Sequence, residues 1–271
     1  MYNNNHDYDS LIRKLKKRKN ATKAIAVILV VLILICTGSH EVVIMDEIVW
    51  AGEGLNPLSS LALSLAVIFC EYIVLGIIQN SVNEPISKDC DPEKHIILSQ
   101  ALNGRNTDYI YATDLFYLGE IEKALPYAEK MISNRKKIFA GLFNKARCEF
   151  FMGDYDSLKA TIGQYENELL GRKKLNNKTK AALTDMLRVM KLLALIADKD
   201  TEKLASYKDI QPWNSNKLTA GYTNYLKGLA ARIVGDTEDA VYRFMFVKDN
   251  CSKTVLASWA TEQLAELKNN D

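Results

Sequence analysis

Lysine and arginine are absent from one long part of the sequence, between Ala24 and Gln79. Because 25% of the whole chain is charged, a soluble domain would not leave so long a stretch without one basic side chain. The same part holds two apolar runs, Ala24–Thr37 and Leu58–Ile78. At about 1.5 Å rise per residue, either run with its flanks can cross the hydrocarbon core of a bilayer. The missing basic residues therefore predict a membrane segment.

We expect this segment to be a transmembrane hairpin over 24–79, with helices over about 21–38 and 57–79 and an outer loop over 39–56. Segment 1–23 is basic, and basic residues of short loops stay in the cytoplasm. Both chain ends are then cytoplasmic, in a multi-pass protein of a bacterial plasma membrane. A cleaved signal is the alternative for the first run. The basic residues that set this topology are Arg13, Lys14, Lys16, Lys17, Arg18 and Lys19.

Glu71 is the one ionisable residue inside the second apolar run. A carboxyl group is costly in a bilayer, so an intramembrane glutamate is a functional candidate. The alternative is structural, with Glu71 bonded to the neighbouring helix or to a second copy of the chain.

Residues that carry catalysis or bind metals are scarce. There are three histidines, and the five cysteines form no C-x-x-C pair. His95 stands before Ile96 and Ile97 and is interpreted as structural, and no glycine motif for phosphate binding occurs. The basic residues beyond residue 91 are interleaved with acids, which is not typical of a nucleic-acid interface. We therefore expect no enzyme, no cofactor, no metal site and no nucleic-acid partner.

From Asp91 onward, apolar residues recur at spacings of three and four, which predicts helices and an all-α fold. Asp91-Pro92 is a helix start and Asn103-Gly104 is a stop. Residues 80–91 are then a linker and 92–271 a cytoplasmic helical domain, in which 252–268 caps the far end. The predicted helices cover 92–102, 107–118, 121–132, 136–152, 155–169, 177–197, 201–208, 217–234, 237–248 and 252–268.

A short motif recurs in this domain. The glycine-acid pair and following residues of Gly119–Met131 return at Gly153–Ala160 and at Gly235–Phe244, with a degenerate copy at Lys199–Ala205. The first two glycines are 34 residues apart. The pattern resembles the tetratricopeptide repeat, whose period is about 34 residues. The resemblance implies a solenoid of antiparallel helix pairs with a concave surface that binds a protein partner.

Aromatic and arginine side chains recur at the positions that this resemblance places on the concave surface. Such residues suit a peptide that carries apolar and acidic groups. The alternative is that the aromatic residues fill the core between helix pairs. The candidate groove residues are Tyr109, Phe116, Phe143, Arg147, Phe150, Tyr225 and Arg232.

Two functions of different class are consistent with these features. The first is a membrane-anchored scaffold or adaptor whose repeat domain binds another protein, with the bilayer as its other partner. The second is an accessory or regulatory subunit of a membrane transport or envelope complex, in which the spans and Glu71 carry the function. In either case the spans could pair two copies of the chain.

Overall fold

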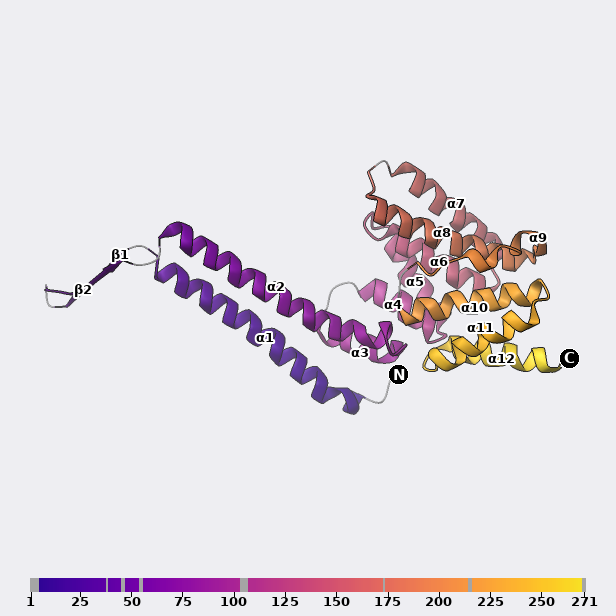
Figure 1. Ribbon diagram of the computed structural model, residues 1–271, viewed down its shortest axis with the longest axis horizontal. Coiled ribbons are helices and arrows are strands. Elements are labelled where there is room, and N and C mark those ends of the chain that lie inside the picture. Colours follow the sequence, from indigo (N-terminus) through magenta and orange to yellow (C-terminus); the bar gives the residue numbers. More distant parts are fainter. Residues whose placement is uncertain are drawn as a thin grey trace. The chain divides into compact units, whose positions relative to one another are not determined.

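The structure is a computed structural model that describes residues 5–37, 39–44, 47–53, 56–102, 107–172, 174–213 and 216–269. The chain divides into two compact units, Met1–Asn83 and Glu84–Asp271. Within the described residues, twelve α-helices account for most of the chain, and one antiparallel pair of strands belongs to the first unit (Figure 1). The fold is therefore helical, as the sequence pattern predicts.

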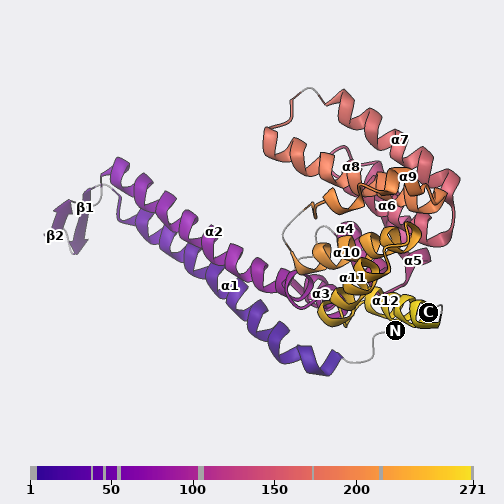
Figure 2. The same ribbon diagram turned by 45° about the vertical axis from the view of Figure 1, so that its right-hand side comes forward.

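The first unit contains α1 (Asn5–Ile35), β1 (Ser39–Ile44), β2 (Glu47–Glu53) and most of α2 (Pro57–Ser87). Helices α1 and α2 run antiparallel and side by side in both views of the ribbon (Figures 1 and 2). The hydroxyl groups of Thr37 and Ser60 form a hydrogen bond, which ties the end of α1 to the start of α2.

Helix α2 is the one helix, within the part of the chain that the structure describes, that is long and apolar enough to cross a membrane. Only 6% of its most apolar 18-residue stretch is buried. A core helix of a soluble protein would have its apolar face covered, so this exposure suggests a membrane span. It begins where the second predicted span begins, but it continues beyond residue 79 to Ser87 and so occupies most of the predicted linker over 80–91.

The first apolar run does not stand alone as a helix, because α1 continues from the basic segment into it. The last 18 residues of α1, which end at Ile35, contain three basic residues: Arg18, Lys19 and Lys23. The part of α1 that is both helical and apolar, from Ala24 to Ile35, is about 18 Å long at 1.5 Å per residue. The structure therefore shows one candidate span, and the expected helix over 21–38 is not a separate one.

The segment expected to be an outer loop forms a β-hairpin. Strands β1 and β2 pair antiparallel, with Ser39 opposite Glu53 and Val42 opposite Trp50, and the register shifts after Val42. The strands are rich in β-branched residues, which favour extended backbone. The charge pattern predicts only a connection here, and the strands lie within that predicted loop over 39–56.

The second unit is a succession of helices. Their bounds agree with the predicted helices to within a few residues, except that 201–208 divides into a four-residue helix and a 3₁₀ turn. The elements are α3 (Pro92–Leu102), α4 (Thr107–Tyr117), α5 (Ile121–Ile132), α6 (Ile138–Met152), α7 (Tyr155–Gly171), α8 (Asn177–Asp198), α9 (Thr201–Leu204), η1 (Tyr207–Asp209), α10 (Lys217–Ile233), α11 (Thr237–Asn250) and α12 (Val255–Asn269).

The recurring glycine-acid pair has a physical role at the helix ends. Gly153 ends α6 with φ of 78°, a left-handed conformation that glycine adopts without a steric penalty. Asp154 then caps α7 by accepting a hydrogen bond from the backbone N–H of Ser157 at 3.2 Å. Gly235 and Asp236 repeat this arrangement before α11. The repeated motif thus marks tight turns between antiparallel helices.

Consecutive helices pack against each other, and the even-numbered helices α4, α6, α8, α10 and α12 also pack in a row. The last helix of the row, α12, also contacts the first two, α4 and α6. The Trp259 ring of α12 stacks on Phe151 of α6, with centroids 4.3 Å apart, and meets the edge of Phe116 of α4. Helix α12 was expected to cap the far end of an open solenoid. It packs mainly against α11 and α10, and through Trp259 it also contacts α4 and α6.

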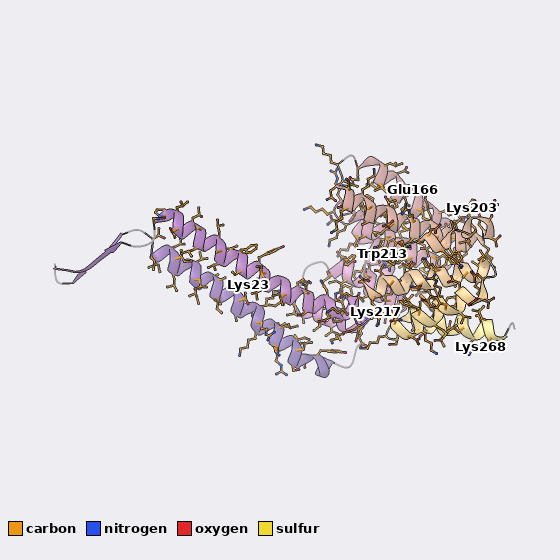
Figure 3. The ribbon with its side chains drawn as sticks, in the orientation of Figure 1. Lys23, Glu166, Lys203, Trp213, Lys217 and Lys268 are labelled. Carbon is orange, nitrogen blue, oxygen red and sulfur yellow. The ribbon has the colours of Figure 1, made fainter. Side chains whose placement is uncertain are left out.

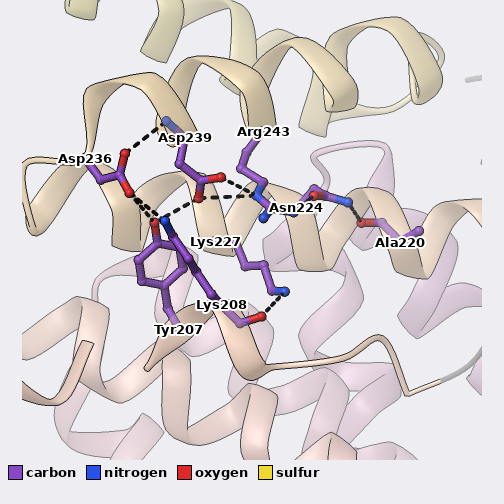
Figure 4. Close-up of polar contacts among 8 residues, drawn as sticks. All are labelled: Tyr207, Lys208, Ala220, Asn224, Lys227, Asp236, Asp239 and Arg243. Atoms are coloured by element: carbon purple, nitrogen blue, oxygen red, sulfur yellow. Dashed lines mark hydrogen bonds and ion pairs between the residues drawn. The ribbon is translucent and has the colours of Figure 1, made fainter. Parts of the chain in front are cut away.

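A polar network joins the short 3₁₀ helix η1 to α10 and α11 (Figure 4). The Tyr207 hydroxyl donates to Asp239 Oδ2 at 2.8 Å, and Lys208 Nζ lies 2.8 Å from Asp236 Oδ2. The Lys227 ammonium donates to the carbonyl oxygen of Lys208 at 2.8 Å, and burial lowers the pKa of Lys227. These bonds join η1 to α10 and to the start of α11.

We expect the fragment 84–271 to stay folded, helical and monodisperse without detergent, because the second unit holds its own core. The matched fragment 57–271 retains α2 and should need detergent. Size-exclusion chromatography and circular dichroism of both fragments test this. Aggregation of 84–271 in the absence of detergent would contradict the division into two units.

Candidate functional site: a pocket beside a buried arginine

Most of the predicted groove residues lie in the core of the second unit. Phe116, Phe143, Arg147, Phe150 and Tyr225 are buried. Tyr109 is 46% exposed. Arg232 is partly exposed and donates to the side chains of Gln263 and Glu266 on α12. The five buried residues therefore do not form the floor of an open groove, because the chain's own helices cover them.

Arg147 lies at the centre of this core and is only 2% exposed. Its guanidinium carbon lies 4.4 Å from the ring centre of Phe116, 4.9 Å from that of Phe143 and 5.3 Å from that of Tyr222. It donates to the Tyr117 hydroxyl at 2.9 Å and to the side-chain oxygen of Asn144. Each cation–π contact is worth about 0.5–2 kcal/mol. The aromatic cage thus offsets part of the cost of burying a charge.

A pocket of about 300 Å³ opens beside Arg147. Its walls come from Ile86 at the end of α2, from α3, α4, α6 and α8, and from the start of α10. Trp213, which Figure 3 labels near Lys217 at the start of α10, completes the wall. Tyr109 also lines the pocket, and its exposure means that the α4 side reaches the surface. Five buried polar residues line the same space: His95, Asp114, Asn144, Arg147 and Thr219.

His95 and Asp114 form a buried pair at this pocket. His95 Nδ1 lies 2.6 Å from Asp114 Oδ2, and both side chains are covered. Burial raises the pKa of Asp114 to about 6, although the neighbouring His95 and Arg147 act in the opposite direction. The hydrogen bond between His95 and Asp114 is strong when the Asp114 carboxyl group is ionised, because the surroundings have a low dielectric constant.

Several polar atoms at this pocket have no hydrogen-bond partner among the described residues. They include His95 Nε2, Asp114 Oδ1 and Arg147 Nε. Leaving a buried donor or acceptor unpaired costs about 1–3 kcal/mol, and more for a charged group. Unpaired polar atoms around one cavity are therefore what a ligand or ordered water would satisfy.

Sequence reasoning missed Asp114 and Trp213 and took His95 as structural. The structure does place His95 in a packed site, as expected, but it also pairs His95 with Asp114. A usable signal was present, since Asp114 precedes Leu115 and Phe116 on an apolar helix face, where a charge is rarely buried without a partner. Trp213 carried no such signal, because it follows an irregular segment.

The remaining candidates lie in the first unit. Glu71 lines an apolar groove of about 410 Å³ between α1 and α2, together with Thr22, Ala26, Leu63 and Cys70. The six basic residues of the cluster lie on α1, and all except the partly covered Lys19 are exposed. These positions suit a helix pair at a membrane surface.

In the ranges that the structure describes, no three His, Cys, Asp or Glu side chains are grouped so that they could hold a metal ion. Comparisons with protein-family models, with curated proteins and with solved structures found no match. What is shown is an all-helical domain of sequentially packed helix pairs. The tetratricopeptide resemblance rests on the repeated residues alone.

Burial of Phe143 generates a prediction about stability. Its ring contacts Arg147 and lies 4.7 Å from the Trp213 ring. Phe143→Ala should lower the unfolding free energy by about 3–5 kcal/mol, as removal of a buried aromatic ring does. Tyr242→Ala is the matched control, because Tyr242 is 62% exposed and should matter little. Urea unfolding of both variants, followed by tryptophan fluorescence, measures the difference, and equal stabilities would contradict the buried position.

The raised pKa of Asp114 predicts a pH dependence. The unfolded carboxyl has the lower pKa of 3.8, so the stability from this group is full below pH 3.8 and is lost as pH rises to about 6. Asp114→Asn has no proton to lose. Between pH 4 and 6.5 the wild type should therefore lose about 1–3 kcal/mol relative to the variant. Urea unfolding of the full chain in detergent across this range tests it, and parallel profiles would disprove the pKa assignment.

Proposed function

We propose that this chain is a membrane-anchored adaptor, in which α2 holds a helix-pair domain near the bilayer and the domain binds another protein. The observation that carries the proposal is the combination of an exposed apolar helix with a separately compact helical unit. Confining one partner near the bilayer raises its effective concentration for the other.

Orientation follows from the charge pattern. The basic cluster on α1 favours the cytoplasmic side, and one or both apolar runs then cross the plasma membrane. If both cross, the hairpin β1–β2 lies outside and the helical domain lies in the cytoplasm. Anionic lipids beside α1 would add about 1 kcal/mol for each basic residue near the surface.

The partner surface must be sought among exposed side chains, since the aromatic residues of the expected groove are mostly buried. Three exposed tyrosines on different helices offer probes: Tyr109 on α4, Tyr155 on α7 and Tyr242 on α11. Large exposed aromatic side chains are common anchors at protein interfaces.

The test is photocrosslinking in the native host, with a photoreactive phenylalanine analogue replacing each of these tyrosines in turn in the full chain. We expect one position to capture the same heterologous protein repeatedly. That capture should be lost when residues 1–83 are deleted and should persist in Glu71→Gln.

Two outcomes would redirect the assignment. Capture of only the chain itself would favour a role in the membrane unit, where Glu71 lines a groove. Loss of capture in Glu71→Gln, with the fold intact, would favour the accessory-subunit function. Absence of any heterologous product from all three positions would overturn the adaptor proposal.

A further inference from the structure

The pocket beside Arg147 has the size of a site for a small molecule. Its volume is about 300 Å³, and ligand pockets run from about 300 to 1,000 Å³. A water molecule occupies about 30 Å³ of liquid, so the pocket holds more than one or two waters. It lies wholly within the second unit.

The polar atoms of this pocket carry opposite charges. Arg147 donates hydrogen bonds and cannot accept them, and among the described side chains no carboxylate oxygen forms an ion pair with it within 4.0 Å. Asp114 accepts through its second oxygen, which has no partner there. A ligand that satisfies both therefore needs an anionic group for Arg147 and an N–H cation for Asp114.

The rest of the wall is mostly apolar. Phe143, Met186, Trp213 and Leu218 line the pocket, and its exposed lining is more apolar than polar. An apolar group of the ligand would be removed from water against these side chains, which favours binding in proportion to the area buried. The pocket thus combines two opposite charges with an apolar wall.

We propose that this pocket binds a free α-amino acid with an apolar side chain. Its carboxylate meets the guanidinium of Arg147, its ammonium meets the free oxygen of Asp114, and its side chain lies against Trp213 and Phe143. The Asp114–His95 pair holds the carboxyl in place for this contact. This site goes beyond the adaptor function and does not depend on it.

The test is isothermal titration calorimetry of the full chain in detergent with L-leucine and L-phenylalanine. Each is compared with its methyl ester, which lacks the carboxylate, and its N-acetyl derivative, which lacks the ammonium. Tryptophan fluorescence provides a second readout, since Trp213 lines the pocket. We expect one free amino acid to bind and both derivatives to bind at least about tenfold more weakly, because each loses a charge-assisted bond.

Variants locate the site. Asp114→Asn keeps the shape of the side chain and should weaken amino-acid binding about tenfold or more. The matched control is Asp249→Asn, an exposed carboxylate of α11 outside the pocket lining, which should bind as the wild type does. Circular dichroism confirms that each variant is folded.

Three results would overturn the proposal. If neither amino acid binds at millimolar concentration, the pocket holds water only. If the ester or the N-acetyl derivative binds equally well, the pocket does not read both charges. If dipeptides that begin or end with the same residue bind as tightly as the free amino acid, the pocket takes a peptide end instead.

Discussion

The packing of helices in the second unit depends on one buried cation, Arg147, whose charge must be compensated. Arg147 stands among the rings of Phe116, Tyr117, Phe143 and Tyr222, and it donates to Tyr117 and Asn144. A charge in a core must be compensated by polar contacts and ring faces, because desolvating it is expensive. The three helices that supply these contacts, α4, α6 and α10, are consequently held together at one point. The pocket lies beside this point, where Phe143, Asn144 and Arg147 form part of its wall.

The rings that compensate the charge of Arg147 also belong to the aromatic core that brings α12 against α4 and α6. Rings that surround Arg147 continue into a wider aromatic core, in which Phe116 contacts both Phe151 and Trp259. Phe116, Phe143 and Phe150, which the repeat resemblance placed on an open inner face, are buried against other rings. The inner face is thus filled by the chain itself. The pocket with Asp114 and His95 remains where the aromatic core gives way to polar side chains.

Local signals in the sequence were sufficient to predict the helices of the second unit, because each helix end depends on a few adjacent residues. Gly153 ends α6 and Asp154 caps α7 whatever these helices pack against, so the bounds of both helices were predictable. The packing of α12 against α4 was not, since the contact of Trp259 with Phe116 joins residues far apart in the chain and no local pattern encodes it. The position of Phe143 was ambiguous for a related reason: helical spacing puts it on an inner face and does not say what covers that face. The β-hairpin and the unbroken α1 show that a charge pattern does not specify secondary structure.

A pocket with unpaired buried polar atoms has a consequence for how the domain responds to what it binds. In the free protein, Asp114 Oδ1 and Arg147 Nε lower its stability, and satisfying them recovers that cost only in the folded state. A ligand of the folded state shifts the unfolding equilibrium by an amount that grows with its concentration relative to its dissociation constant. Because the pocket walls come from α3, α4, α6, α8 and α10, one bound molecule would tie together elements from most of the helix pairs. Under the two proposals made above, occupancy of the cavity would stiffen the surface that a partner binds, and the contacts of Trp259 with Phe116 and Phe151 would extend this effect to α12.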